Sequence, residues 1–370
     1  MLEKIFKLKQ NKTTVRTELI AGVITFLTMS YILVVNPNIL GATGMDREAL
    51  FTATALATVL GTLFMAFIPN LPVAQAPGMG LNSFFAFSVV IGLGYSWQMA
   101  LTAVFIQGII FVLLTLFNIR ELIVKSIPLT IKHAIPVGIG LFITLLGLQN
   151  AGLIVKDENT MVTLGAMSNH HVWIALLGLI LTAVLYYKKV HGSFLIGIAA
   201  ATIFAITLGE VHIPEGSLIA LPPDIAPIFM QFEWANIFTL DMLVVVFTFL
   251  FVNLFDTIGT LLGVASKIGI TDDNGDFPQL KRALFADALG TTFGAVLGTS
   301  TVTSYVESAS GVAVGGRTGL TALSTAAMFA LALFFAPLFL MVPASATAPA
   351  LIIVGLFMIT SVVKINFDDM

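Results

Sequence analysis

Apolar runs of roughly bilayer length recur along the whole chain, and they limit its fold more than any other feature. A bilayer core of about 30 Å needs about 20 apolar residues per helix. The longer runs cover residues 19–35, 50–68, 99–117, 137–148, 173–187, 194–208, 242–262, 283–297, 320–340 and 348–363. Two further runs have about half that length. The sequence therefore predicts an all-α, polytopic membrane protein with about twelve membrane elements.

The composition excludes the main classes of soluble protein. Hydrophobic residues make up 58% of the chain and charged residues 10%, with a mean hydropathy of +1.01. Because soluble domains carry a charge on roughly a quarter of their residues, this chain cannot be a cytosolic enzyme, a nucleic-acid-binding protein or a disordered protein. Cysteine is absent and the five histidines lack metal-ligand spacing, so we expect no disulfide and no metal site.

The positive charges predict an orientation, because Lys and Arg are retained on the cytoplasmic side. If the N-terminus is cytoplasmic, all of the 17 Lys and Arg residues except Arg47 and Lys156 fall inside or at the inner end of a half-helix. This holds only when both short runs count as membrane elements. The loop 209–241 contains acids but no Lys or Arg, as an external loop should. No cleavage site follows the first run, so we expect no signal peptide.

The two short runs, 81–91 and 305–314, each follow a stretch that is not regular helix. The stretch QAPGMG before the first is extended or turned, so we expect helix from about Asn82. The stretch GTSTVT before the second is β-branched, which predicts a short strand and then helix from Ser304. Paired interrupted segments in two halves of a chain are typical of inverted-repeat transporters with a site at the membrane midplane.

Asp256 lies inside the run 242–262, where an ionised carboxylate costs at least about 3 kcal/mol on insertion scales. It must therefore face protein or water. One polar stripe of this helix, at positions i, i+3, i+4 and i+7, consists of Asn253, Asp256, Thr257 and Thr260. A hydrogen-bonded seam between helices is the structural alternative. A carboxylate is a costly way to build a seam, so we favour a functional role.

Glu307 and Asn82 open the two predicted half-helices, and each has both a structural and a functional interpretation. Ser304 and Glu307 have the spacing of a capping box, but at membrane depth the same carboxylate can also meet a substrate. Asn82 is a good N-cap, and its amide offers donors and an acceptor to a ligand.

Several strings closely resemble the AzgA-like purine permeases of the nucleobase–cation symporter-2 (nucleobase/ascorbate transporter) family. They are TVRTELIAG at 14–22, APGMGLNSFF at 76–85, LFDTIGTL at 254–261, TSTVTSYVES at 299–308 and GGRTGL at 315–320. The resemblance covers essentially the whole chain. It implies a seven-plus-seven inverted-repeat fold with two half-helices preceded by short strands, and proton-coupled import of hypoxanthine, guanine or adenine by an elevator-type motion, commonly in a homodimer.

The resemblance also implies a division of the chain into two domains. A core domain would comprise 15–128 (helices 1–4) and 236–340 (helices 8–11), and a gate domain 129–210 (helices 5–7) and 341–370. Family members usually continue for about two more membrane helices, so we expect a C-terminally short chain with about twelve of fourteen elements and a truncated second gate portion.

By motif, the resemblance makes Asp256 and Glu307 the substrate-binding acids and Asn82 the polar residue of the first half-helix. We add as substrate-binding candidates the neighbours Thr257, Thr303, Ser304 and Phe84, and as weaker stacking candidates Phe85 and Tyr31. A neutral purine needs acceptors for its ring N–H groups, donors for its ring nitrogens and apolar surface for its faces. Proton coupling follows if Asp256 or Glu307 is held protonated and releases its proton inside; the sequence leaves open which one.

Competing functions remain open at this stage. Half-helices also suit carriers of uracil, xanthine or anions, and broken helices line channels as well. A channel would place like residues at its breaks, whereas Asn82 and Glu307 are unlike. A membrane enzyme needs a nucleophile–base pair or a metal cluster, and no His or Cys lies in a predicted span. We expect a secondary active transporter in the inner or plasma membrane, with no enzymatic activity, no cofactor and no nucleic-acid partner.

Overall fold

The computed structural model describes residues 2–117, 129–158, 160–213, 217–235, 237, 239–271 and 277–365. Within these ranges seven helical segments are long and apolar enough to cross a membrane, and three shorter apolar helices accompany them. The predicted helical membrane fold is therefore confirmed. The expected domain boundary near 128, the side chain of Lys364 and the last five residues lie outside the described part of the chain.

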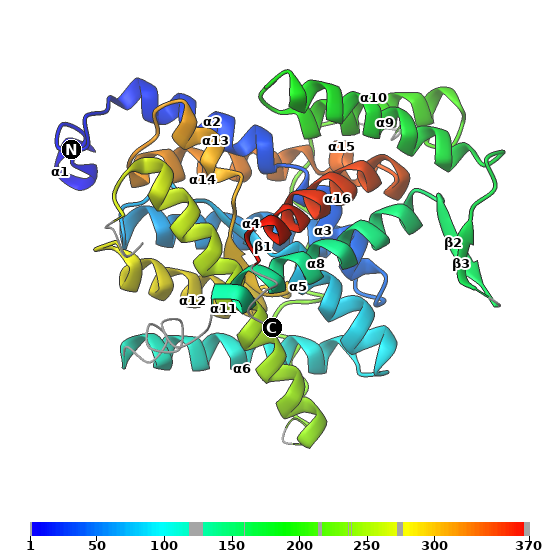
Figure 1. The fold of residues 1–370 in the computed structure, drawn as a ribbon, viewed down its shortest axis with the longest axis horizontal. Coiled ribbons are helices and arrows are strands. Elements are labelled where there is room, and N and C mark those ends of the chain that lie inside the picture. Colours follow the sequence, from blue (N-terminus) through cyan, green and yellow to red (C-terminus); the bar gives the residue numbers. More distant parts are fainter. Residues whose placement is uncertain are drawn as a thin grey trace.

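One set of helices, which we call the first helix group, contains helices from both halves of the chain. It comprises α2 (Val15–Met29), α3 (Ile32–Gly41), α4 (Arg47–Phe67), α6 (Trp97–Leu116), α11 (Leu240–Ile268), α12 (Leu280–Val296) and α14 (Gly319–Ala332). Here α14 packs on α2 and α4, and α12 packs on α4 and α6. Figure 1 shows α12 and α14 of the second half beside α6, α2 and α4 of the first. Helices from the two halves of the chain thus pack against each other.

A second helix group packs mainly on itself. It comprises α8 (Leu129–Asn150), α9 (His170–Tyr187), α10 (Ser193–Thr207) and α16 (Ala344–Ile359). Contact between α8 and α16 is close, since a Cβ atom on Gly140 would lie 2.5 Å from the carbonyl oxygen of Gly355. A hairpin of β2 (Ile154–Asp157) and β3 (Met161–Leu164) extends away from this group (Figure 1).

Short elements complete the described chain. They are α1 (Leu2–Phe6), η2 (Leu333–Phe335), α15 (Ala336–Leu340) and η3 (Thr360–Lys364).

The two interrupted segments meet inside the first helix group. The first is β1 (Gln75–Pro77) followed by α5 (Met79–Ser83) and the π-helical η1 (Phe84–Gly92), and the second is β4 (Val302–Ser304) followed by α13 (Ser308–Ala313). The strands β1 and β4 pair antiparallel, with Ala76 opposite Thr303. Both segments are thus half-helices preceded by short strands, as predicted.

Both half-helices begin at residues other than those expected. The first begins at Met79 rather than near Asn82, because Gly78 adopts an extended conformation and serves as the N-cap. The second begins at Ser308 rather than Ser304, because Ser304 is paired with Gln75 in the sheet.

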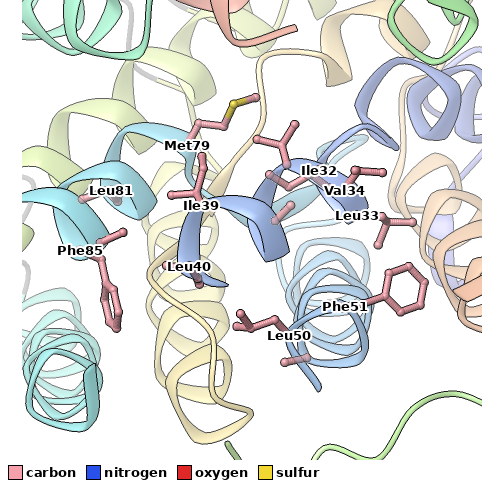
Figure 2. Close-up of a cluster of buried hydrophobic side chains, with 14 of the residues drawn as sticks. Ile32, Leu33, Val34, Ile39, Leu40, Leu50, Phe51, Met79, Leu81 and Phe85 are labelled. Atoms are coloured by element: carbon pink, nitrogen blue, oxygen red, sulfur yellow. The ribbon is translucent and has the colours of Figure 1, made fainter. Parts of the chain in front are cut away.

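A buried apolar cluster holds the first half-helix in place. Figure 2 shows side chains from α3, α4, α5 and η1 that meet in this cluster; they include Ile32, Leu33, Val34, Ile39, Leu40, Leu50, Phe51, Met79, Leu81 and Phe85. Most of them are fully buried. Burying such side chains contributes about 1.5–3 kcal/mol each. The packing of α5 against α3 therefore fixes its position, since a helix of five residues is too short to be stable alone.

Candidate substrate site

Glu307 lies at the N-cap of α13, and its carboxylate is engaged by a distant residue rather than by a capping box. Its side chain makes no cap hydrogen bond, so the capping-box interpretation is wrong. Instead, the hydroxyl of Tyr31 donates to Oε1 of Glu307 at 2.5 Å. Ser304 cannot act as the partner because Gln75 lies opposite it in the sheet, with its Nε2 3.4 Å from the Ser304 hydroxyl.

Tyr31 lies at the break between α2 and α3 and is 1% exposed. Its ring packs against Phe194 of α10, with centroids 5.3 Å apart. Sequence reasoning named Tyr31 only as a stacking candidate. In the structure it joins the carboxylate of the second half-helix to the second helix group.

Asn82 lies within α5 and is fully buried. It is not the N-cap, since Gly78 takes that position. The hydroxyl of Ser300 donates to its Oδ1, and its amide nitrogen lies 3.5 Å from the carbonyl oxygen of Pro77. Asn82 therefore ties the first half-helix to the stretch that leads into β4.

Asp256 lies beside the strand pair β1–β4. Its side chain is hydrogen-bonded to Thr303 of β4, and its Oδ2 lies 3.7 Å from the position that a Cβ atom on Gly78 would take. Asp256 and Glu307 are both partly exposed, whereas Asn82 and Thr303 beside them are buried. The two carboxyl groups therefore keep some exposed surface, and the polar side chains beside them do not.

A third carboxyl group lies behind Asp256, and sequence reasoning missed it. Asp287 of α12 is fully buried. Thr257 donates to it at 2.8 Å, and the hydroxyls of Thr257 and Thr303 are 3.0 Å apart. A chain of polar groups thus links Asp256 through two threonines to Asp287. The signal was available, because Asp287 is an acid inside the apolar run 283–297, as Asp256 is inside its own run.

The two aromatic candidates on the first half-helix pack on α11. Phe84 meets Phe249 edge to face, with centroids 4.9 Å apart, and Phe85 lies 6.5 Å from the same ring. Phe84 is partly exposed, and Phe85 is fully buried. The structure gathers the polar candidates of the two half-helices and α11 around the strand pair β1–β4. Phe84 occupies the neighbouring apolar wall.

Comparison with known proteins agrees with this architecture. Residues 16–370 match the model of a family described as "Permease family". The chain is 46% identical over 368 residues to the adenine permease AdeQ of Escherichia coli (strain K12), covering all of this chain and 82% of that protein. It is also 46% identical over 379 residues to the guanine/hypoxanthine permease PbuG of Bacillus subtilis (strain 168), covering 99% of this chain and 86% of that protein.

Among solved structures, the transmembrane domain of a cyanobacterium bicarbonate transporter, BicA, has the same fold. The TM-score is 0.69 at 18% sequence identity, with 93% of this chain and 88% of that chain covered. The inverted-repeat transporter fold expected from the sequence is therefore confirmed. The chain is therefore a permease and not an enzyme. As its motifs indicated, this multi-pass membrane protein belongs to the permease family.

Proposed function

We propose that this protein is a secondary active transporter that imports purine nucleobases, namely guanine, hypoxanthine or adenine, across the cell membrane. The observation that carries the proposal is the pair of partly exposed carboxyl groups, Asp256 and Glu307, beside the strand pair β1–β4. The similarity to the adenine permease AdeQ and the guanine/hypoxanthine permease PbuG, each 46% identical to this chain, supports purines as the substrate class.

The side chains around the strand pair β1–β4 match the chemistry of a purine. A purine ring presents N–H donors at its edge; an ionised carboxylate accepts at both oxygens, and a protonated carboxyl group still accepts at its carbonyl oxygen. In the proposed binding mode Glu307 and Asp256 accept these N–H groups, and Asn82, Thr257, Thr303 and Ser304 complete the polar wall. The partly exposed ring of Phe84 supplies apolar surface for a face of the heterocycle.

Proton symport and the elevator mechanism are part of the same proposal. Either Asp256 or Glu307 carries the proton, because a carboxyl group in low-dielectric surroundings favours its neutral form. The first helix group, which holds the site, corresponds to the core domain expected at 15–128 and 236–340. The second corresponds to the gate domain expected at 129–210 and 341–370. Separate packing of the two groups supports this division.

We also propose that the protein assembles as a homodimer with its N-terminus in the cytoplasm. The distribution of Lys and Arg supports this orientation.

Uptake of radiolabelled hypoxanthine, guanine, adenine, xanthine and uracil, with and without a protonophore, tests the substrate and the coupling ion. We expect purine uptake, and we expect it to decrease when the protonophore is present. Uptake of uracil or xanthine alone would overturn the choice of substrate, and protonophore-insensitive uptake would overturn proton symport.

Two substitutions test the site. Glu307→Gln and Asp256→Asn should each weaken purine binding more than about tenfold, which corresponds to about 1.4 kcal/mol for a hydrogen bond to a charged group. Asp241→Asn is the matched control, because Asp241 is an exposed acid in the first turn of the same helix. Unchanged binding in both site variants would reduce the two acids to structural residues.

A further inference from the structure

A cavity of about 270 Å³ lies between α4, α6 and α12 of the first helix group. Its lining residues come from the C-terminal ends of α4 and α6 and from the first two turns of α12; they are Ile68, Thr115, Leu116, Lys281, Arg282 and Phe285. None of them belongs to the proposed substrate site. The cavity therefore needs a separate explanation.

The lining combines a hydrocarbon wall with two cations. Ile68, Leu116 and Phe285 supply the apolar part. Lys281 and Arg282 are both exposed. Within the described ranges no carboxylate forms an ion pair with either of them. Two positive charges that no described carboxylate neutralises, beside an apolar wall, suit a ligand that has both an anionic group and a hydrocarbon part.

The apolar wall continues outward along α6. Ile109, Leu113 and Leu116 lie at positions i, i+4 and i+7 and are 40%, 49% and 55% exposed. Phe293 on α12 is also exposed, and it packs against Phe64 of α4 with centroids 5.5 Å apart. Residues at this spacing form one stripe of a helix, so the stripe leads from the cavity into the part of α6 that faces the lipid.

We propose that this cavity is a binding site for an anionic phospholipid. Lys281 and Arg282 hold the headgroup phosphate, and an acyl chain follows the stripe on α6. Arginine offers several N–H donors to phosphate oxygens and lysine adds a point charge. Basic pockets between membrane helices at the cytoplasmic side bind such headgroups. The charge distribution predicts that these helix ends are cytoplasmic. A soluble anion would leave the apolar wall unused.

Lipid retention measured by native mass spectrometry tests the site. The purified full chain is delipidated and mixed with dioleoyl phosphatidylglycerol or dioleoyl phosphatidylcholine. Wild type should retain phosphatidylglycerol preferentially. Lys281→Gln/Arg282→Gln should retain about tenfold less, and the two single variants should retain intermediate amounts. The charge-preserving swap Lys281→Arg/Arg282→Lys should restore retention.

A matched control is available at the end of α9, where Lys188 and Lys189 are exposed on the same predicted side of the membrane. Lys188→Gln/Lys189→Gln removes the same charge and should retain phosphatidylglycerol as wild type does. The proposal would be overturned if Lys281→Gln/Arg282→Gln retained as much phosphatidylglycerol as wild type does. It would also be overturned if the control variant lost as much retention as Lys281→Gln/Arg282→Gln. Inorganic phosphate and phosphatidylglycerol are also compared for their protection of the wild type against thermal unfolding. If phosphate protects as strongly as phosphatidylglycerol does, the site binds soluble anions and the proposal of a lipid site is overturned.

Discussion

Glu18 is the buried acid whose removal tests the packing of the first helix group most directly. It lies on α2, is fully buried, and accepts five hydrogen bonds from the start of α14. Its Oε1 accepts from the backbone N–H of Arg317 at 2.9 Å. Its Oε2 accepts from the backbone N–H and hydroxyl of Thr318 and of Thr321, at distances between 2.6 and 3.2 Å.

These contacts set the size of the expected effect. Glu18→Ala leaves three backbone N–H groups without their acceptor, and each such group costs about 1–3 kcal/mol when buried. Because the segment relaxes in part, we expect a total loss of about 3–5 kcal/mol in the free energy of unfolding. Glu18→Gln keeps one oxygen for Thr318 and Thr321 but turns an amide donor toward the N–H of Arg317. We therefore expect a smaller loss of about 1–3 kcal/mol.

The purified variants are heated in detergent, and size-exclusion chromatography then measures the fraction that remains folded. The midpoints of these unfolding curves give the order of stability. Wild type should be the most stable, followed by Glu18→Gln and then Glu18→Ala. Glu48→Ala is the control, because Glu48 is an exposed acid in the first turn of α4. A midpoint for Glu18→Ala within error of the control would refute the argument that the buried carboxylate holds α2 to α14.

Two further substitutions test single contacts. Tyr31→Phe removes the hydroxyl that donates to the half-helix carboxylate at 2.5 Å but keeps the ring, so purine binding should weaken about tenfold. The control Tyr187→Phe, at an exposed tyrosine, should bind as wild type does, and an equal affinity in the two variants would contradict the assignment. Gly319→Ala places a Cβ atom 2.1 Å from the carbonyl oxygen of Ala66, so α14 must move and the melting temperature should fall. Gly263→Ala, where a Cβ atom meets nothing within 4 Å, should leave it unchanged or raised.

The break in each half of the chain could be predicted from the sequence because its causes are local. Proline and glycine before α5, and β-branched residues before α13, disfavour helix wherever the chain runs. The distribution of Lys and Arg then required both short runs to enter the membrane. The pairing of β1 with β4 could not be predicted in register, since it joins Gln75 to Ser304 across the whole intervening chain.

The capping-box prediction failed because a distant contact overrode a local rule. The box requires Ser304 to be free to serve as the N-cap of the helix that contains Glu307. In the structure Ser304 is the last residue of β4 and lies opposite Gln75. Glu307 is then released from its local partner and accepts from Tyr31, which lies 276 positions away in the sequence. Glu18 was missed for the same reason, because Arg317 is 299 positions away.

The strand pair β1–β4 is too small to hold the site by itself. Each strand has three residues, and an isolated two-stranded ribbon is marginal in stability. The flanking helices fix it instead: the hydroxyl of Thr62 on α4 donates to the carbonyl of Gln75, and that of Thr291 on α12 donates to the carbonyl of Val302.

Asp256 is attached to the same frame through Thr303, and Glu307 follows β4 directly. Asp256 is built on α11 of the first helix group, and Glu307 lies at the N-cap of α13, which packs on α2 and α11 of that group. Tyr31 belongs to that group as well, but its ring meets Phe194 of the second group through an aromatic contact. An aromatic contact can slide at less cost than a hydrogen bond to a carboxylate can break. If the two groups move relative to one another, as the elevator proposal requires, the binding site moves with the first group as one unit.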